Sequence, residues 1–142
     1  MRRLTRGLAV VAAVGATYTV WTLAHQIAGV ELVVDGGSVT PAAVVLATVI
    51  AGLAAWALLA LLERLTRRAA AIWSGIAGAV LLVSLLGPIG SAVGAGATAA
   101  LVAMHLAAGA VLIPLLAHSS VACRASVASE PDTAPSRAVN RG

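Results

Sequence analysis

Four long apolar stretches constrain this chain more than any other feature. They cover residues 7–29, 41–62, 69–90 and 97–117. As α-helices they would be roughly 31 to 35 Å long, which matches a bilayer hydrocarbon core of about 30 Å. The chain is 61% hydrophobic and 10% charged, and a water-soluble fold of 142 residues cannot cover that much apolar surface. The sequence therefore predicts an all-α protein whose four transmembrane helices form an up-and-down bundle.

Local signals mark the ends of several of these stretches. Thr40 and Pro41 are suited to the N-cap and first turn of the second helix. Charged residues that cannot enter lipid follow that helix: Glu63, Arg64, Arg67 and Arg68. Pro88 is expected to disturb the end of the third helix. Gly94 and Gly96 predict a short turn, so the last two helices are expected to form an antiparallel pair.

The arginines predict an orientation in the membrane. Seven lie close to the ends of the apolar stretches, all on one side: Arg2, Arg3, Arg6, Arg64, Arg67, Arg68 and Arg124. The connections on the other side carry only Glu31 and Asp35 as charged residues. Because arginine-rich loops stay in the cytoplasm, we expect a multi-pass protein of the bacterial inner membrane with both termini cytoplasmic. Trp56 and Trp73 lie near that side and are expected to anchor in the headgroup region.

The two ends of the chain leave further points open. Residues 1–16 resemble a cleavable signal peptide, but the apolar run continues to Gly29, which favours a retained helix. Residues 119–142 mix serine, alanine, proline and scattered charge, and predict a disordered cytoplasmic tail after a transmembrane domain of residues 1–118. The single cysteine, Cys123, excludes an intrachain disulfide and a cysteine-based metal cluster.

Polar side chains within the apolar stretches are the candidate site residues. One face of the first helix repeats at spacings of three and four and is expected to point into the bundle: Gly15, Tyr18, Thr22, His25 and Gly29. With polar residues at its edge and at similar depth in other helices, it gives a candidate intramembrane cluster of Tyr18, Thr22, His25, Gln26, Ser84 and His105. Such a cluster is either a helix-packing seam or a functional polar site, and both interpretations stay open.

His25 and His105 are expected to face each other across the first and fourth helices. Two imidazoles are also the ligands of a bis-histidine haem, but no basic group on that side is placed to bind the propionates. Zinc would lack sufficient ligands. Glu63 and Arg67 have the spacing of a helical salt bridge, which indicates interfacial pairing rather than acid–base chemistry.

No cofactor or metal is therefore assigned, and the lack of hydrolase, phosphate-loop and dinucleotide motifs predicts a protein that is not an enzyme. The formal charge of +4 does not indicate nucleic-acid binding, because the arginines form short clusters beside apolar stretches. Small residues four apart, Thr48 with Gly52 and Ser74 with Gly78, are typical of closely packed membrane helices.

Three segments of the chain form a characteristic pattern: residues 56–64, residues 84–88, and His105 with Pro114 nine positions later. This pattern resembles a family of small actinobacterial four-helix membrane proteins of unknown function. The acidic connection around Glu31 and residues 35–37 is also similar to that family. The resemblance covers residues 7–118 and implies a four-helix fold without an assigned activity.

Three function classes remain open. The leading one is a non-enzymatic membrane module that packs against a second copy of itself or another membrane protein, within the lipid bilayer. The second is a small transporter or channel subunit that uses the polar cluster. The third is a haem or redox membrane protein.

Overall fold

The computed structural model describes residues 2–35 and 37–128, with side chains for residues 3–35 and 37–119. Its elements in chain order are α1 (Arg2–Thr22), the π-helix η1 (Leu23–Ile27), β1 (Val33–Val34), β2 (Gly37–Ser38), α2 (Pro41–Leu65), α3 (Ala69–Ser84), α4 (Leu86–Ser91) and α5 (Ala95–Ala128). Four segments are long and apolar enough to cross a membrane: Arg3–Ile27, Pro41–Leu65, Ala69–Ser91 and Ala95–Ser119. The predicted all-α class with four candidate spans is confirmed.

Two of the expected helix boundaries have the predicted cause. The Thr40 hydroxyl accepts a hydrogen bond from the Ala43 backbone N–H at 3.2 Å, and Pro41 begins α2. The third span is interrupted at Leu85, between α3 and α4. Pro88 has no N–H to donate to the carbonyl of Ser84 one turn earlier, so an uninterrupted helix would lose a bond there.

The fourth span differs from the sequence prediction at its far end. α5 continues to Ala128, so the predicted domain end at residue 118 falls inside a helix. Residues 119–128 contain no glycine or proline that would stop it, and Pro114 is accommodated within α5 without ending it. The remainder of the predicted tail, residues 129–142, lies outside the described residues.

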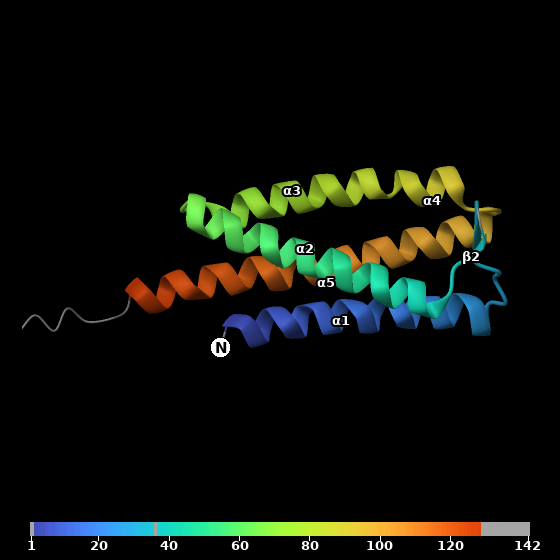
Figure 1. Ribbon diagram of the computed structural model, residues 1–142, viewed down its shortest axis with the longest axis horizontal. Helices are drawn as coiled ribbons and strands as arrows, with labels where there is room; N and C mark the ends of the chain where they lie inside the picture. The colour runs from blue at the N-terminus through green and yellow to red at the C-terminus, as the bar shows by residue number, and fades with distance from the viewer. Residues whose placement is uncertain (1, 36, 129–142) are drawn as a thin grey trace, which may run out of the picture.

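The four spans pack side by side, and successive spans run in opposite directions (Figure 1). α1 contacts α2 and α5, and α3 also contacts α2 and α5. Two clusters of buried side chains fill the space between them. One consists of Ala9, Val10, Ala13, Leu59, Trp73, Leu112 and Leu116. The other consists of Trp21, Leu32, Val44, Ala100, Leu101 and Met104.

The face of α1 that points inward is not the predicted one. Its buried residues are spaced three and four apart and include Arg6, Ala9, Ala13, Thr17 and Trp21. The predicted inward face points outward instead, with exposed residues at Gly15, Tyr18, His25 and Gly29 and a half-buried Thr22. That prediction assumed that polar groups must face protein. Small side chains at positions 9 and 13 decide the packing face, because they allow the neighbouring helices to approach closely.

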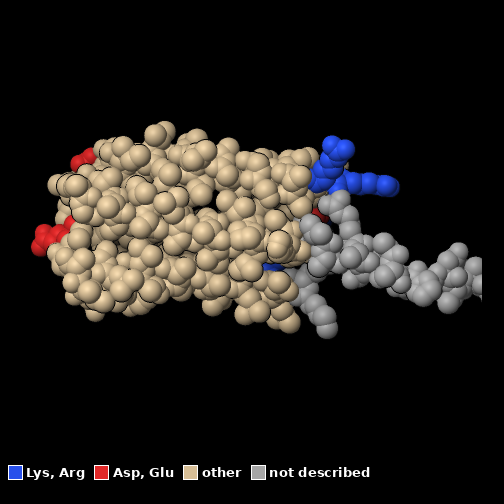
Figure 2. All heavy atoms as spheres, turned by 180° about the vertical axis from the view of Figure 1, so that it is seen from behind, with Lys and Arg blue, Asp and Glu red and all other residues tan. Residues whose placement is uncertain are grey.

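The charged side chains that the structure describes lie at the two ends of the molecule (Figure 2). We call the end with Arg3, Arg6, Arg64, Arg67 and Arg68 the arginine-rich end, and the end with Glu31 and Asp35 the acidic end. The surface between them is free of Lys, Arg, Asp and Glu on the face shown. Such a belt is expected of helices whose middle parts lie in hydrocarbon.

The two connections at the acidic end are joined by a small β-structure that the sequence did not predict. β1 pairs antiparallel with β2, and Val34 also forms a bridge to Ala92 in the connection before α5. Val93 N–H donates to the Val33 carbonyl at 2.9 Å, and Asp35 N–H donates to the Ser91 carbonyl at 3.0 Å. These bonds tie the α1–α2 connection to the α4–α5 connection. Gly94, at φ +89°, makes the tight turn into α5.

Candidate functional site

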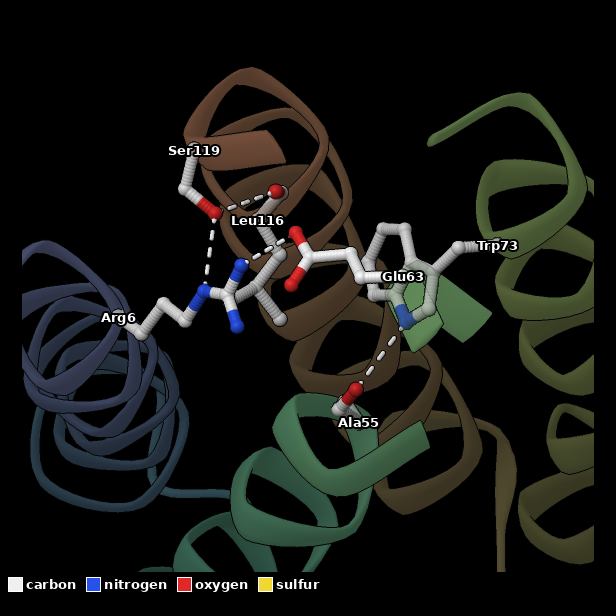
Figure 3. A network of polar contacts seen from close by, with 6 residues as sticks. All are labelled: Arg6, Ala55, Glu63, Trp73, Leu116 and Ser119. Carbon is white, nitrogen blue, oxygen red and sulfur yellow. Dashed lines mark hydrogen bonds and ion pairs between the residues drawn. The ribbon is translucent and has the colours of Figure 1, made fainter. Parts of the chain in front are cut away.

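The most elaborate polar arrangement lies at the arginine-rich end, where three helices meet at Arg6 (Figure 3). Arg6 of α1 donates through Nη2 to Glu63 Oε1 of α2 at 2.5 Å. It also donates through Nε to Ser119 Oγ of α5 at 3.2 Å. The Ser119 hydroxyl in turn donates to the Leu116 carbonyl at 2.7 Å. We call these three residues, Arg6, Glu63 and Ser119, the arginine clamp.

The arginine clamp is largely shielded from water. The side chain of Arg6 is 6% exposed and that of Glu63 is 24% exposed. A buried charge is tolerated only when it is paired and its donors are satisfied. Here one guanidinium bonds both a carboxylate and a hydroxyl, which links α1 to α2 and to α5. This arrangement holds helices together and leaves little of the guanidinium accessible to a ligand.

The clamp replaces the pairing expected from sequence. Glu63 was expected to pair with Arg67 along its own helix, and that prediction is wrong, because Glu63 is paired with Arg6. α2 ends at Leu65 and Thr66 is already extended, with φ −147° and ψ 147°. Arg67 therefore lies beyond the helix that would have placed it one turn from Glu63.

Trp73 lies in the core next to the clamp rather than at the membrane interface (Figure 3). It is 1% exposed, and its indole Nε1 donates to the Ala55 carbonyl of α2 at 3.1 Å. Leu59 and Leu116, also fully buried, belong to the same cluster. The prediction that Trp73 anchors in the headgroup region is therefore wrong. Trp56 is half-buried.

The small residues Thr48 and Gly52 of α2 lie at the contact with α1, as expected for small residues four positions apart. Thr48 Oγ1 lies 3.2 Å from Thr17 Oγ1 across the two helices. One turn further, a Cβ added at Gly52 would lie 2.9 Å from Val10 Cγ1, so the two helices are in close contact there. The other predicted pair is Ser74 with Gly78. A Cβ added at Gly78 would meet no atom within 4 Å, so no close helix contact is found at that position.

The six residues of the predicted polar cluster mostly bond within their own segments. The Thr22 hydroxyl donates to the Tyr18 carbonyl at 2.9 Å, and the Ser84 hydroxyl donates to the Leu81 carbonyl at 2.7 Å. His105 Nδ1 lies 2.8 Å from the Leu101 carbonyl one turn earlier in α5. Serine, threonine and histidine can satisfy themselves in this way in a helix, so they need no partner on a neighbouring helix.

His25 lies at the acidic end, on the outward side of η1. Its Nδ1 lies 3.3 Å from the Val30 carbonyl, and its ring packs against Trp21 with centroids 5.0 Å apart. Gln26, next to it, is exposed. Within the described part of the chain, no hydrogen bond joins His25 to His105. Trp21 instead contacts both neighbouring rings, stacked on Tyr18 and tilted against His25.

The arrangement offers limited means for chemistry. Among the side chains of residues 3–35 and 37–119, no three of His, Cys, Asp or Glu converge in a way that would hold a metal ion. A shallow groove between α1 and α2 is lined by Tyr18, Pro41, Ala42, Val45, Leu46 and Val49, and it is almost entirely apolar.

Comparison with known proteins places the chain in a family. The family of unknown function DUF6069 matches residues 1–122. The chain belongs to this family. Membership confirms the resemblance to a family without an assigned activity, and the match covers all four candidate spans. Neither a curated protein nor a solved structure gave a match.

Sequence reasoning missed Arg6 and Ser119 as partners. A signal for Arg6 was present, because it continues the series of residues 6, 9, 13, 17 and 21 that proved to be the buried face of α1. A charged residue in phase with small residues indicates a buried, paired charge. Ser119 carried no such signal, since it was assigned to the tail.

Proposed function

We propose that this member of DUF6069 is a non-enzymatic module of the bacterial inner membrane that associates with a second copy of itself. In this proposal the four spans form an up-and-down bundle with both termini in the cytoplasm. The arginines at one end and the carboxylates of Glu31 and Asp35 at the other support that orientation. The association surface is the outward face of α3 and α4.

The low coverage of the third span carries the proposal. In an apolar 18-residue stretch of this span, 11% of the residues are buried inside the protein. The corresponding share in the other three spans is 22 to 28%. The outward side chains of α3 include Ile72, Ile76 and Val80. Gly75 and Ala79 are exposed beside them. Branched side chains that flank small residues allow two membrane helices to approach and interdigitate.

Gly75 provides a specific test of this surface. A Cβ added there meets nothing within 4 Å, so Gly75→Leu leaves the packing of one copy intact but keeps a second helix at a distance. Gly15 of α1 is also exposed and free of such contacts. Gly15→Leu is therefore the matched control on a different span.

The measurement is energy transfer between copies labelled at Cys123, reconstituted in vesicles over a range of protein-to-lipid ratios. The wild type should associate, Gly75→Leu should weaken the association about tenfold, which corresponds to about 1.4 kcal/mol, and Gly15→Leu should leave it unchanged. Transfer in the wild type no higher than for randomly distributed monomers would contradict the proposal. Equal weakening by both substitutions would also contradict it.

A further inference from the structure

The groove between α1 and α2 has the shape and position of a lipid site, and we infer that it binds one phospholipid. An acyl chain would lie along α2, and a glycerol ester oxygen of the same lipid would accept a hydrogen bond from the Tyr18 hydroxyl. This inference concerns α1 and α2 and does not depend on the association surface of α3 and α4.

The position of the groove identifies the bilayer as its surroundings. Pro41 lines the groove and is the first residue of α2 and of the second candidate span. The groove thus begins where the span begins, and it continues to Val49, about 12 Å along the helix axis. Its volume of about 430 Å³ is in the range of small-molecule sites. The groove opens to the outside of the bundle, since Leu46 is 61% exposed. At the depth of a membrane span, the apolar ligand that surrounds the protein is the acyl chain of a lipid.

Tyr18 supplies the polar contact. It is 45% exposed, and its hydroxyl has no hydrogen bond to another described residue. The outward threonines of the same helix differ in this respect, because Thr19 and Thr22 donate to the carbonyls of Gly15 and Tyr18 at 2.8 and 2.9 Å. The phenol of tyrosine extends too far from the backbone to do the same. A hydroxyl in apolar surroundings without a partner is costly, and the ester oxygens of a lipid, which lie at the edge of the hydrocarbon region, are suitable acceptors.

The Tyr18 ring is held in place on its other side. It stacks on Trp21 with centroids 6.1 Å apart and an interplanar angle of 25°. Trp21 is itself buried, and its indole Nε1 donates to the Val39 carbonyl at 3.0 Å. The tyrosine therefore rests against a fixed partner, which makes one wall of the groove pre-formed and lowers the ordering cost of binding.

Native mass spectrometry can count the retained lipid. The protein is reconstituted in vesicles of phosphatidylethanolamine and phosphatidylglycerol, extracted in mild detergent, and checked for folding by circular dichroism and gel filtration. The wild type should retain one phospholipid of either kind. Val45→Trp fills the groove and should abolish retention. Leu61→Trp, exposed on the same helix away from the groove, should retain it.

A second pair of variants tests the hydroxyl. Tyr18→Phe keeps the ring and should weaken retention about fivefold, as expected for the loss of one hydrogen bond. Thr19→Val removes a hydroxyl that bonds its own helix and should leave retention unchanged. The inference is overturned if the wild type retains no lipid, or if all variants retain it equally. It is also overturned if only phosphatidylglycerol is retained and Arg67→Gln abolishes this, which would place the lipid at the arginine-rich end.

Discussion

Removal of one partner of the arginine clamp should destabilise the protein more than removal of an exposed arginine. Breaking a buried ion pair costs about 3 to 5 kcal/mol, because the remaining charge is left without compensation. Glu63→Ala leaves the Arg6 guanidinium, 6% exposed, with the Ser119 hydroxyl as its remaining side-chain partner among the described residues. We expect a loss of about 3 kcal/mol, near the lower limit, since the site lies close to one end of the bundle.

Arg6→Ala should cost less, because it leaves behind a carboxylate that is 24% exposed and therefore better hydrated. We expect about 2 kcal/mol, part of which is lost packing of the arginine stem. The double variant Arg6→Ala with Glu63→Ala should cost less than the sum of the single variants, with a coupling energy of about 2 kcal/mol.

The free energy of unfolding can be measured by titrating the protein in mixed micelles with a denaturing detergent. Arg67→Ala is the control, since Arg67 is exposed and has no ion pair within the described residues; its effect should stay within about 0.5 kcal/mol. A coupling energy near zero, or a control as destabilising as Glu63→Ala, would refute the reasoning that the buried ion pair of the clamp links α1 to α2.

Two further substitutions test the helix packing by the same assay. Gly52→Ala should destabilise the protein by about 1 to 3 kcal/mol, because its Cβ would lie 2.9 Å from Val10 Cγ1. The control Gly78→Ala should be neutral or slightly stabilising. Equal effects of the two substitutions would contradict the close contact at Gly52. Trp73→Phe should cost about 1 to 3 kcal/mol through the lost bond to a backbone carbonyl and the lost volume, and a larger effect of Trp56→Phe would contradict the assignment of Trp73 to the core.

The overall fold was largely accessible from the sequence. Apolar length fixes how many times the chain can cross a bilayer, and Thr40 with Pro41 fixes the start of α2 through local capping chemistry. Local signals were less reliable at the far end of the fourth span. The serines there suggested a tail, but without a glycine or proline the helix continues to Ala128.

The candidate site was less accessible, for a physical reason. The choice of inward face on α1 depends on how closely neighbouring helices approach, which is a property of their combined surfaces and cannot be derived from one helix. Polar residues such as Thr22 and His105 satisfy themselves on their own backbone, so their presence in an apolar stretch does not predict that they meet. The partner of Glu63 is 57 positions away at Arg6, beyond what spacing along one helix can indicate.

The β-structure at the acidic end illustrates the same limit. Its strands are two residues each, and Val34 pairs with Ala92, a residue from a distant part of the chain. Strands this short contain no alternation of apolar and polar residues from which such pairing could be predicted. The two connections are brought together by the packing of the helices that they join.

The central claim of four membrane crossings with both termini cytoplasmic is tested most directly by thiol accessibility in intact cells. Single cysteines at position 35 (Asp35→Cys) and position 67 (Arg67→Cys) are introduced into a chain that carries Cys123→Ser, and an impermeant thiol reagent is added before or after lysis. The proposed orientation predicts that the cysteine of Asp35→Cys is labelled in intact cells and that of Arg67→Cys only after lysis. Labelling of the Arg67→Cys chain in intact cells, or of the Asp35→Cys chain only after lysis, would contradict it.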